Sequence, residues 1–240
     1  MSVFLLGGGR DVARCGDLLR PFVLEARERA GDRPPVIALL LVLVLDADDD
    51  TRIALHRAML DAAQAVPAEI RVETIVEGEV FDASALAADA LFVGGGLTPA
   101  YLDAFAQIRD AVIERVREGM PYAGFSAGSV IAAGPALVGG YRLGGVEVVS
   151  ENAGEELDEL EVRAGLGLLD FAVDVHAAQW GTLSRLVAAV DAGLVSDGVA
   201  IDEHTALVIS AQAAPAVRGG GQVWRVESSA SGVHVQVLRA

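Results

Sequence analysis

The hydrophobic positions of the chain form short apolar runs separated by longer amphipathic segments. In the first half, the apolar runs predict strands at residues 3–6, 36–45, 71–76, 90–93 and 121–125. Apolar residues at helical spacing predict helices at residues 12–30, 51–66, 82–88 and 99–118. We assign Thr98 as the N-cap of the last helix and Pro99 to its first turn. Strands that alternate with helices indicate a three-layer α/β fold, with a mostly parallel sheet flanked by helices.

The second half of the chain is richer in glycine and valine. Its strands are predicted at residues 138–143 and 146–149, at 171–176, and as a pair within 199–209. Its helices are predicted at residues 127–133 and 180–191. Residues 222–227 and 233–238 alternate in polarity, which predicts a C-terminal antiparallel hairpin. No repeat or flexible linker is visible, so we expect a single domain over residues 1–240.

The segment Gly124-Phe125-Ser126-Ala127-Gly128 has the pattern of a nucleophile elbow. A serine on a sharp strand-to-helix turn needs small residues two positions before and after it, because the backbone passes close to itself there. The N–H of Ala127 would then lie at a helix N-terminus, where it can stabilise an oxyanion. The glycine turn at 94–96 ends a neighbouring parallel strand and can offer a second N–H. With 27 glycines in the chain, an ordinary Gly-Ser turn is the alternative.

Composition and charge exclude several classes of protein. With 52% hydrophobic residues and a mean hydropathy of +0.43, the chain is expected to form a well-packed globule. The formal net charge of −16 opposes binding to nucleic acid or to anionic membranes, because both are negatively charged. The longest apolar run, at 36–45, is about half as long as a membrane-spanning helix, and no secretory leader is visible. We therefore expect a cytoplasmic protein.

Four further features are interpreted as structural. The single cysteine, Cys15, has no partner for a disulfide and lies in a predicted helix. The glycine turn at 7–9 lacks the dinucleotide-binding and Walker motifs, which disfavours nucleotide binding. The aspartates within 46–50 are interpreted as capping a helix rather than binding a metal ion. The acidic segment 151–161 is expected to face solvent, and the alternative is a flap that binds a basic substrate.

A serine nucleophile needs a base, and the chain contains four histidines. His56 and His234 are expected at the surface. His176 ends a predicted strand and is the candidate base. Glu203 is the candidate acid, because acidic residues between two buried-looking runs need partners. The alternatives for the acid are Asp202, Asp174 and Glu151.

Several segments together carry a resemblance to a known family. They are Gly94-Gly95-Gly96-Leu97-Thr98, Gly124-Phe125-Ser126-Ala127-Gly128-Ser129, Gly165-Leu166-Gly167-Leu168-Leu169, Asp174-Val175-His176 with Arg185-Leu186, and Ile201-Asp202-Glu203-His204-Thr205-Ala206-Leu207. In this order they resemble the S51 serine peptidases, which include aspartyl dipeptidase (peptidase E) and cyanophycinase on a class I glutamine amidotransferase-like fold.

The resemblance implies a Ser-His-acid hydrolase in which Ser126 is the nucleophile and His176 the base. Likeness to cyanophycinase around residue 203 implies Glu203 as the third member, whereas likeness to peptidase E leaves Glu147 or Glu151 open. Family members work without a metal ion or organic cofactor, so none is expected here.

The resemblance also implies the oxyanion donors and the substrate. The donors would be the N–H groups of Ala127 and of either Gly95 or Gly96. The substrate would be a short peptide or isopeptide that contains aspartate, of the Asp-X or β-Asp-X kind, and a homodimer is compatible with such a scaffold.

The chain departs from the family pattern at several positions. Ala177 replaces the aromatic residue that follows the histidine in cyanophycinase-like sequences, and only Arg185 remains of the arginines after it. Leu97 replaces the asparagine that is usual in peptidase E-like sequences. These changes leave the aspartyl specificity open, and a degenerate scaffold that binds or regulates is the alternative function. Glutamine amidotransferase chemistry is disfavoured because it needs a cysteine at the elbow.

Overall fold

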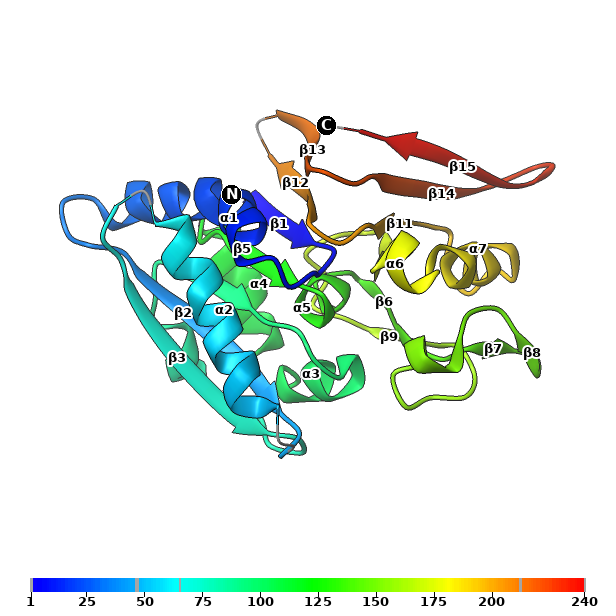
Figure 1. Cartoon of the computed structure of the whole chain (residues 1–240), viewed down its shortest axis with the longest axis horizontal. Coiled ribbons are helices and arrows are strands. Elements are labelled where there is room, and N and C mark those ends of the chain that lie inside the picture. Colours follow the sequence, from blue (N-terminus) through cyan, green and yellow to red (C-terminus); the bar gives the residue numbers. More distant parts are fainter. Residues whose placement is uncertain (1, 46–47, 65, 212, 240) are drawn as a thin grey trace.

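The computed structural model describes residues 2–45, 48–64, 66–211 and 213–239. Within them, the largest sheet has seven strands in the order β13-β12-β1-β5-β4-β2-β3 (Figure 1). Its parallel strands are β1 (Ser2–Leu6), β5 (Tyr122–Phe125), β4 (Ala90–Val93), β2 (Val36–Leu43) and β3 (Glu69–Val76). Two antiparallel strands, β12 (Thr205–Ser210) and β13 (Ala213–Gly219), extend it beyond β1.

Helices cover both faces of this sheet because alternate side chains of each strand point to opposite faces. One face packs against α1 (Val12–Ala30) and α2 (Asp49–Ala63). The other packs against the 3-10 helix η1 (Ala83–Leu86) and helices α3 (Thr98–Ala104), α4 (Arg109–Arg117) and α5 (Ala127–Ile131). The predicted three-layer α/β fold with a mostly parallel sheet is confirmed.

A second sheet of four strands has the order β10-β11-β14-β15. Strands β10 (Ala172–Val175) and β11 (Asp197–Ile201) are parallel, and β14 (Val223–Ser229) and β15 (Gly232–Leu238) form the antiparallel hairpin that the sequence predicts. Helix α7 (Leu183–Asp191) packs on this sheet, and the short helix α6 (Ala177–Trp180) follows β10. The chain passes from this sheet to the larger one through residues 202–204, between β11 and β12.

Residues 135–164 contain two small antiparallel pairs. β6 (Pro135–Gly139) pairs with β9 (Glu161–Ala164), and β7 (Arg142–Leu143) pairs with β8 (Val146–Glu147). The 3-10 helix η2 (Glu151–Ala153) lies between β8 and β9. The predicted strand at 138–143 is therefore divided between β6 and β7, and no strand is predicted for β9 or β13.

Two segments that were each predicted as one helix form two helices instead. The segment 99–118 forms α3 and α4, with a break where the N–H of Phe81 donates to the carbonyl of Ala104 at 2.9 Å. Thr98 is the first helical residue rather than the N-cap, which is Leu97. The segment 180–191 is divided between α6 and α7 at Gly181, whose φ is 75°.

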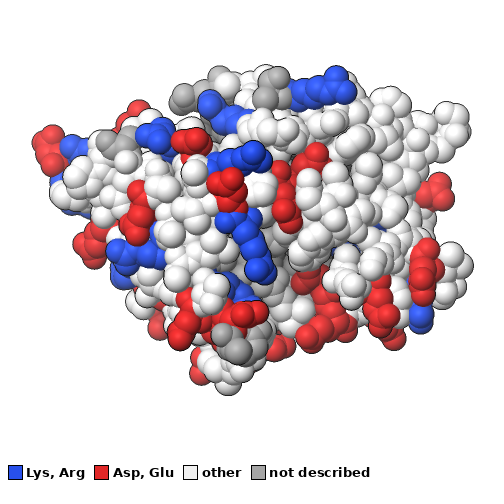
Figure 2. Space-filling model, viewed as in Figure 1, with Lys and Arg blue, Asp and Glu red and all other residues white. Residues whose placement is uncertain are grey.

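The described aspartates of the acidic run lie at the N-terminus of α2. Asp48 stands at the N-cap position, and Asp49 and Asp50 occupy the first turn, where Asp49 pairs with Arg52. Asp46 lies outside the described residues. Figure 2 shows carboxylates mainly at the left and along the lower edge of one molecular face, with arginines between them and a short run of arginines near its centre. None of the helices in the described ranges is long and apolar enough to cross a bilayer.

Candidate active site

Ser126 lies on a strained turn between β5 and α5. Its φ and ψ are 52° and −113°, a backbone conformation that is rare for a residue other than glycine and costs free energy. A side chain at Gly124 would collide with the carbonyl oxygen of Gly128, and one at Gly128 would collide with the carbonyl oxygen of Val93. The two glycines therefore allow the close backbone approach that the elbow pattern predicts.

Hydrogen bonds hold this turn against β1. The N–H of Ser126 donates to the carbonyl of Leu6 at 3.0 Å. The Ser129 hydroxyl lies 2.8 Å from the same carbonyl and 2.7 Å from that of Gly124. The buried Tyr122 hydroxyl donates to the carbonyl of Gly128 at 2.6 Å. The surrounding structure thus supports the strained backbone at Ser126.

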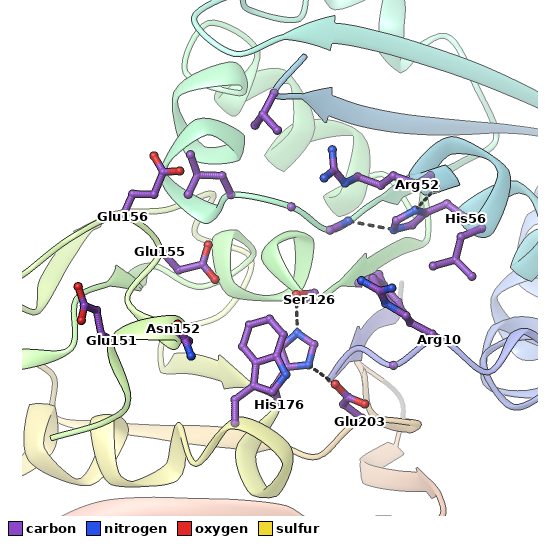
Figure 3. Close-up of a pocket in the computed structure, with 18 residues that line it drawn as sticks. Arg10, Arg52, His56, Ser126, Glu151, Asn152, Glu155, Glu156, His176 and Glu203 are labelled. Carbon is purple, nitrogen blue, oxygen red and sulfur yellow. Dashed lines mark hydrogen bonds and ion pairs between the residues drawn. The ribbon is translucent and has the colours of Figure 1, made fainter. Parts of the chain in front are cut away.

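His176 reaches Ser126 from the end of β10, and Glu203 contacts His176 from the connection between β11 and β12. His176 follows β10 with a left-handed backbone, φ 56°, and its N–H donates to the carbonyl of Gly7 at 3.0 Å. Its Nε2 lies 2.9 Å from the Ser126 Oγ (Figure 3). Its Nδ1 lies 2.8 Å from Glu203 Oε1. The three side chains form one hydrogen-bonded chain at the junction of the two sheets.

The surroundings of His176 favour its neutral form. Its side chain is 8% exposed, and burial lowers its pKa below the ordinary value, although the Glu203 carboxylate acts in the opposite direction. The Trp180 ring stacks on the imidazole with centroids 3.9 Å apart and an interplanar angle of 7°. A neutral imidazole that donates from Nδ1 to Glu203 has Nε2 available to accept the Ser126 proton.

The other candidate acids have different partners. Asp174 is fully buried and forms a two-pronged ion pair with Arg185, with N···O distances of 2.9 and 2.7 Å. Asp202 accepts from the N–H groups of Ala178 and Gln222 and from the indole of Trp224.

The remaining candidates, Glu147 and Glu151, lie on the surface. Glu147 faces Arg142 across 3.5 Å, and Glu151 is exposed on the rim of the pocket. Of the candidate acids, all within the described residues, Glu203 is the one that contacts His176.

The candidate oxyanion donors require one correction. The N–H of Gly95 donates to Nε2 of His56 at 3.1 Å, so it points away from a carbonyl at Ser126. Gly96 lines the pocket, and within the described residues its N–H has no hydrogen-bond partner. Ala127 is the first residue of α5, beside Ser126. The geometry therefore leaves Ala127 and Gly96 as the candidate pair.

The prediction that His56 lies at the surface is wrong. Its relative exposure is 2%, and its ring packs between Phe92 and Phe125. A histidine in an amphipathic helix gives no sign of a tertiary partner, so the sequence pattern could not reveal this contact. His234 is exposed, as predicted.

The glycine turn at 7–9 is a part of the site that the sequence analysis does not predict. A side chain at Gly8 would collide with the imidazole of His176, and one at Gly9 would collide with His204. Both glycines have positive φ, 101° and 107°. The N–H of His204 donates to the carbonyl of Gly8 at 2.9 Å. This turn therefore sets the position of His176. The one sign of it in the sequence is the run of glycines that directly follows the first predicted strand.

Ser126 opens into a pocket of about 630 Å³ that is lined by charged side chains. Figure 3 shows Arg10 and Arg52 on one side of Ser126, together with Glu203, and the carboxylates of Glu151, Glu155 and Glu156 on the other side. The two sides would attract groups of opposite charge on one ligand.

The acidic segment is thus not wholly solvent-facing as predicted. Glu155 is partly buried, its carboxylate accepts the N–H of Thr98 at 2.9 Å, and burial raises its pKa. It caps the N-terminus of α3 while it forms part of the pocket wall. In the described residues, no group of three or more His, Cys, Asp or Glu side chains is arranged to hold a metal ion.

Comparison with known families tests the resemblance that the sequence segments carry. A family model described as peptidase family S51 matches residues 44–217, more than half of the chain. The chain belongs to peptidase family S51. The predicted resemblance is confirmed, and the protein is a hydrolase of the peptidase class whose serine type fits the family.

Two solved structures resemble the chain over most of its length. One, described as a peptidase from an acI-B1 actinobacterium, is 18% identical with a TM-score of 0.72, and the match covers 100% of this chain and 94% of that one. A putative peptidase E protein from Listeria monocytogenes EGD-e is 15% identical with a TM-score of 0.56, covering 92% and 98%. At these identities the likeness shows the shared fold. None of the curated proteins matches the chain.

The departures from the S51 pattern can now be placed in space. Arg185 is 3% exposed and is held by Asp174 and by the carbonyl of Ala153 in η2, so it supports the pocket wall from behind. Leu97 lines the pocket directly, and Ala177 is buried at the start of α6. Arg185 is therefore not positioned to bind a substrate carboxylate. The arginines that line the pocket are Arg10 and Arg52.

Proposed function

We propose that this S51 protein is a serine peptidase that hydrolyses short aspartate-containing peptides or isopeptides through Ser126, His176 and Glu203. The observation that carries the proposal is the unbroken hydrogen-bonded chain from the Ser126 Oγ through His176 to Glu203, with distances of 2.9 and 2.8 Å. A nucleophile, a base and an orienting acid in this order are the requirements for acyl transfer.

In the proposed reaction, His176 removes the proton of Ser126 as its Oγ attacks the amide carbonyl. Glu203 holds the imidazole orientation and stabilises its positive charge. The N–H groups of Ala127 and Gly96 bind the oxyanion of the tetrahedral intermediate. His176 then donates its proton to the leaving amine, and water, activated by the same base, releases the acyl group from Ser126.

The charged walls of the pocket support a short zwitterionic substrate. A carboxylate of an aspartyl group would lie toward Arg10, because Arg52 is already paired with Asp49. A free ammonium group would lie toward Glu151 and Glu156. A pocket of about 630 Å³ is in the range that holds one small ligand. We therefore place Asp-X and β-Asp-X dipeptides first among the substrates.

The test is the hydrolysis of Asp-X, β-Asp-X and uncharged dipeptides by the wild type and by Ser126→Ala. We expect the wild type to hydrolyse one aspartyl class and the variant, with an unchanged melting temperature, to be inactive. Full activity in the variant would remove Ser126 from the mechanism. No turnover of any peptide by the wild type would favour the degenerate scaffold that binds or regulates.

A further inference from the structure

The buried histidine of α2 contacts the turn that carries a candidate oxyanion donor. His56 Nδ1 lies 2.7 Å from the carbonyl oxygen of Arg52, and Nε2 lies 3.1 Å from the nitrogen of Gly95. A carbonyl oxygen only accepts and a peptide N–H only donates, so Nδ1 carries the proton and Nε2 is the acceptor. These two bonds define a single neutral tautomer of His56.

The next peptides of the turn are fixed as well. The carbonyl of Gly94 accepts the N–H of Gly128 at 3.0 Å, so the Gly94–Gly95 peptide is held at both ends. The carbonyl of Gly95 accepts the hydroxyl of the fully buried Tyr101 at 3.2 Å. In a trans peptide the C=O and N–H point in opposite directions, so this bond turns the N–H of Gly96 away from Tyr101.

The turn is also in close contact with the nucleophile. A Cβ on Gly95 would lie 3.0 Å from the Cβ of Ser126, which shows how closely the two backbones approach. The His56 ring packs edge-on against Phe125, the residue before Ser126, with centroids 5.0 Å apart. One buried side chain therefore contacts both the glycine turn and the elbow.

We propose that His56, together with Tyr101, is a positioning residue that presets the Gly96 N–H for the oxyanion. This proposal rests on the proposed serine mechanism, and His56 acts through the Gly95 peptide without touching the substrate. A protonated His56 would place an N–H against the N–H of Gly95, so the neutral form is required. Burial lowers the pKa of His56 to about 4, although the hydrogen bond to the Arg52 carbonyl acts in the opposite direction, and the charge of Arg52 lowers it further. Phe92 and Phe125 face it from β4 and β5.

The proposal predicts which substitutions restore the function. His56→Leu removes the acceptor for the Gly95 N–H while filling the apolar space, and His56→Gln supplies a carbonyl acceptor again. Loss of one oxyanion donor costs roughly 100- to 1,000-fold in kcat, so loss of its support is expected to cost about 10- to 100-fold. KM should change less than about threefold, because the donor acts on the transition state.

The experiment measures the rate of labelling by a fluorophosphonate probe, together with peptide hydrolysis. The probe places a phosphoryl oxygen where the oxyanion forms, so labelling of Ser126 should slow in His56→Leu and in Tyr101→Phe. His56→Gln should recover at least part of the rate. His234→Leu, at an exposed position on the terminal hairpin, is the matched control and should label like the wild type.

The outcomes separate this proposal from the proposed mechanism. If the wild type is not labelled, or is labelled equally in Ser126→Ala, the serine mechanism fails. If the wild type is labelled at Ser126 and both His56→Leu and Tyr101→Phe react at its rate, the positioning role is wrong and the mechanism stands. Should His56→Leu fail to fold, Tyr101→Phe still decides, because it removes a single hydroxyl and keeps the ring.

Discussion

Replacing Glu203 by glutamine tests the acid of the proposed triad without changing its shape. Glu203 Oε1 lies 2.8 Å from His176 Nδ1, and the two side chains are 21% and 8% exposed. The amide oxygen of glutamine can still accept the Nδ1 proton, so the neutral imidazole keeps its orientation. The variant lacks the negative charge that stabilises the imidazolium formed during acyl transfer.

The expected loss follows from the geometry of this pair. Two unit charges about 4 Å apart attract by about 4 kcal/mol at an effective dielectric constant of about 20. The carboxylate is partly exposed, which weakens the attraction, and the amide dipole replaces a part of it. We therefore expect a rise of about 2–3 kcal/mol in the activation free energy, which lowers kcat about 30- to 150-fold.

The assay is steady-state hydrolysis of the best dipeptide across pH, with Glu147→Gln as the control. Glu147 is also an acid candidate but lies with Arg142 at the surface, so its variant should keep the wild-type kcat. The Glu203 carboxylate raises the pKa of His176. Its removal in Glu203→Gln should therefore lower that pKa and move the acidic limb of the profile to lower pH. A Glu203→Gln enzyme with wild-type kcat, or an equal loss in Glu147→Gln, would refute the reasoning.

Three further predictions concern the wild type and the pocket. Because burial lowers the pKa of His176, and a base must be unprotonated, kcat/KM should stay level at neutral pH and fall only below about pH 6.5; a fall that begins above pH 7 would contradict this. Arg10→Ala should raise KM for aspartyl dipeptides about tenfold and leave kcat within about threefold, whereas equal effects on uncharged dipeptides would exclude a carboxylate contact. Burial raises the pKa of the Cys15 thiol to about 12, so iodoacetamide should neither modify the native protein nor inhibit it, as intact mass and activity will show.

Local patterns were sufficient to predict the elbow and the central sheet. The elbow needs small residues at fixed offsets from Ser126, and buried parallel strands form continuous apolar runs, so both leave a signature in adjacent residues. His176 and Glu203 were accessible because each follows the end of an apolar run. Their distances from Ser126 depend on the packing of two sheets, which spacing along the chain does not encode.

Features that depend on tertiary partners were not predictable. The strands β10 and β11 are apolar runs like those of the larger sheet, so their separate sheet has no local signature. The break after α3 contains neither glycine nor proline, and it coincides with the carbonyl of Ala104 accepting the Phe81 N–H, a tertiary contact. In the sequence, Gly95 and Gly96 are equally good candidates for the second oxyanion donor. Only the hydrogen bond between Gly95 and His56 distinguishes them.

The most direct test of the central claim is to map the residue that a fluorophosphonate probe modifies, by mass spectrometry of the wild type and Ser126→Ala. A strained serine beside a neutral imidazole should react, so the account predicts one adduct on the peptide that contains Ser126 and none in the variant. An adduct on another residue, or an unreactive wild type, would contradict the claim that Ser126 is an activated nucleophile.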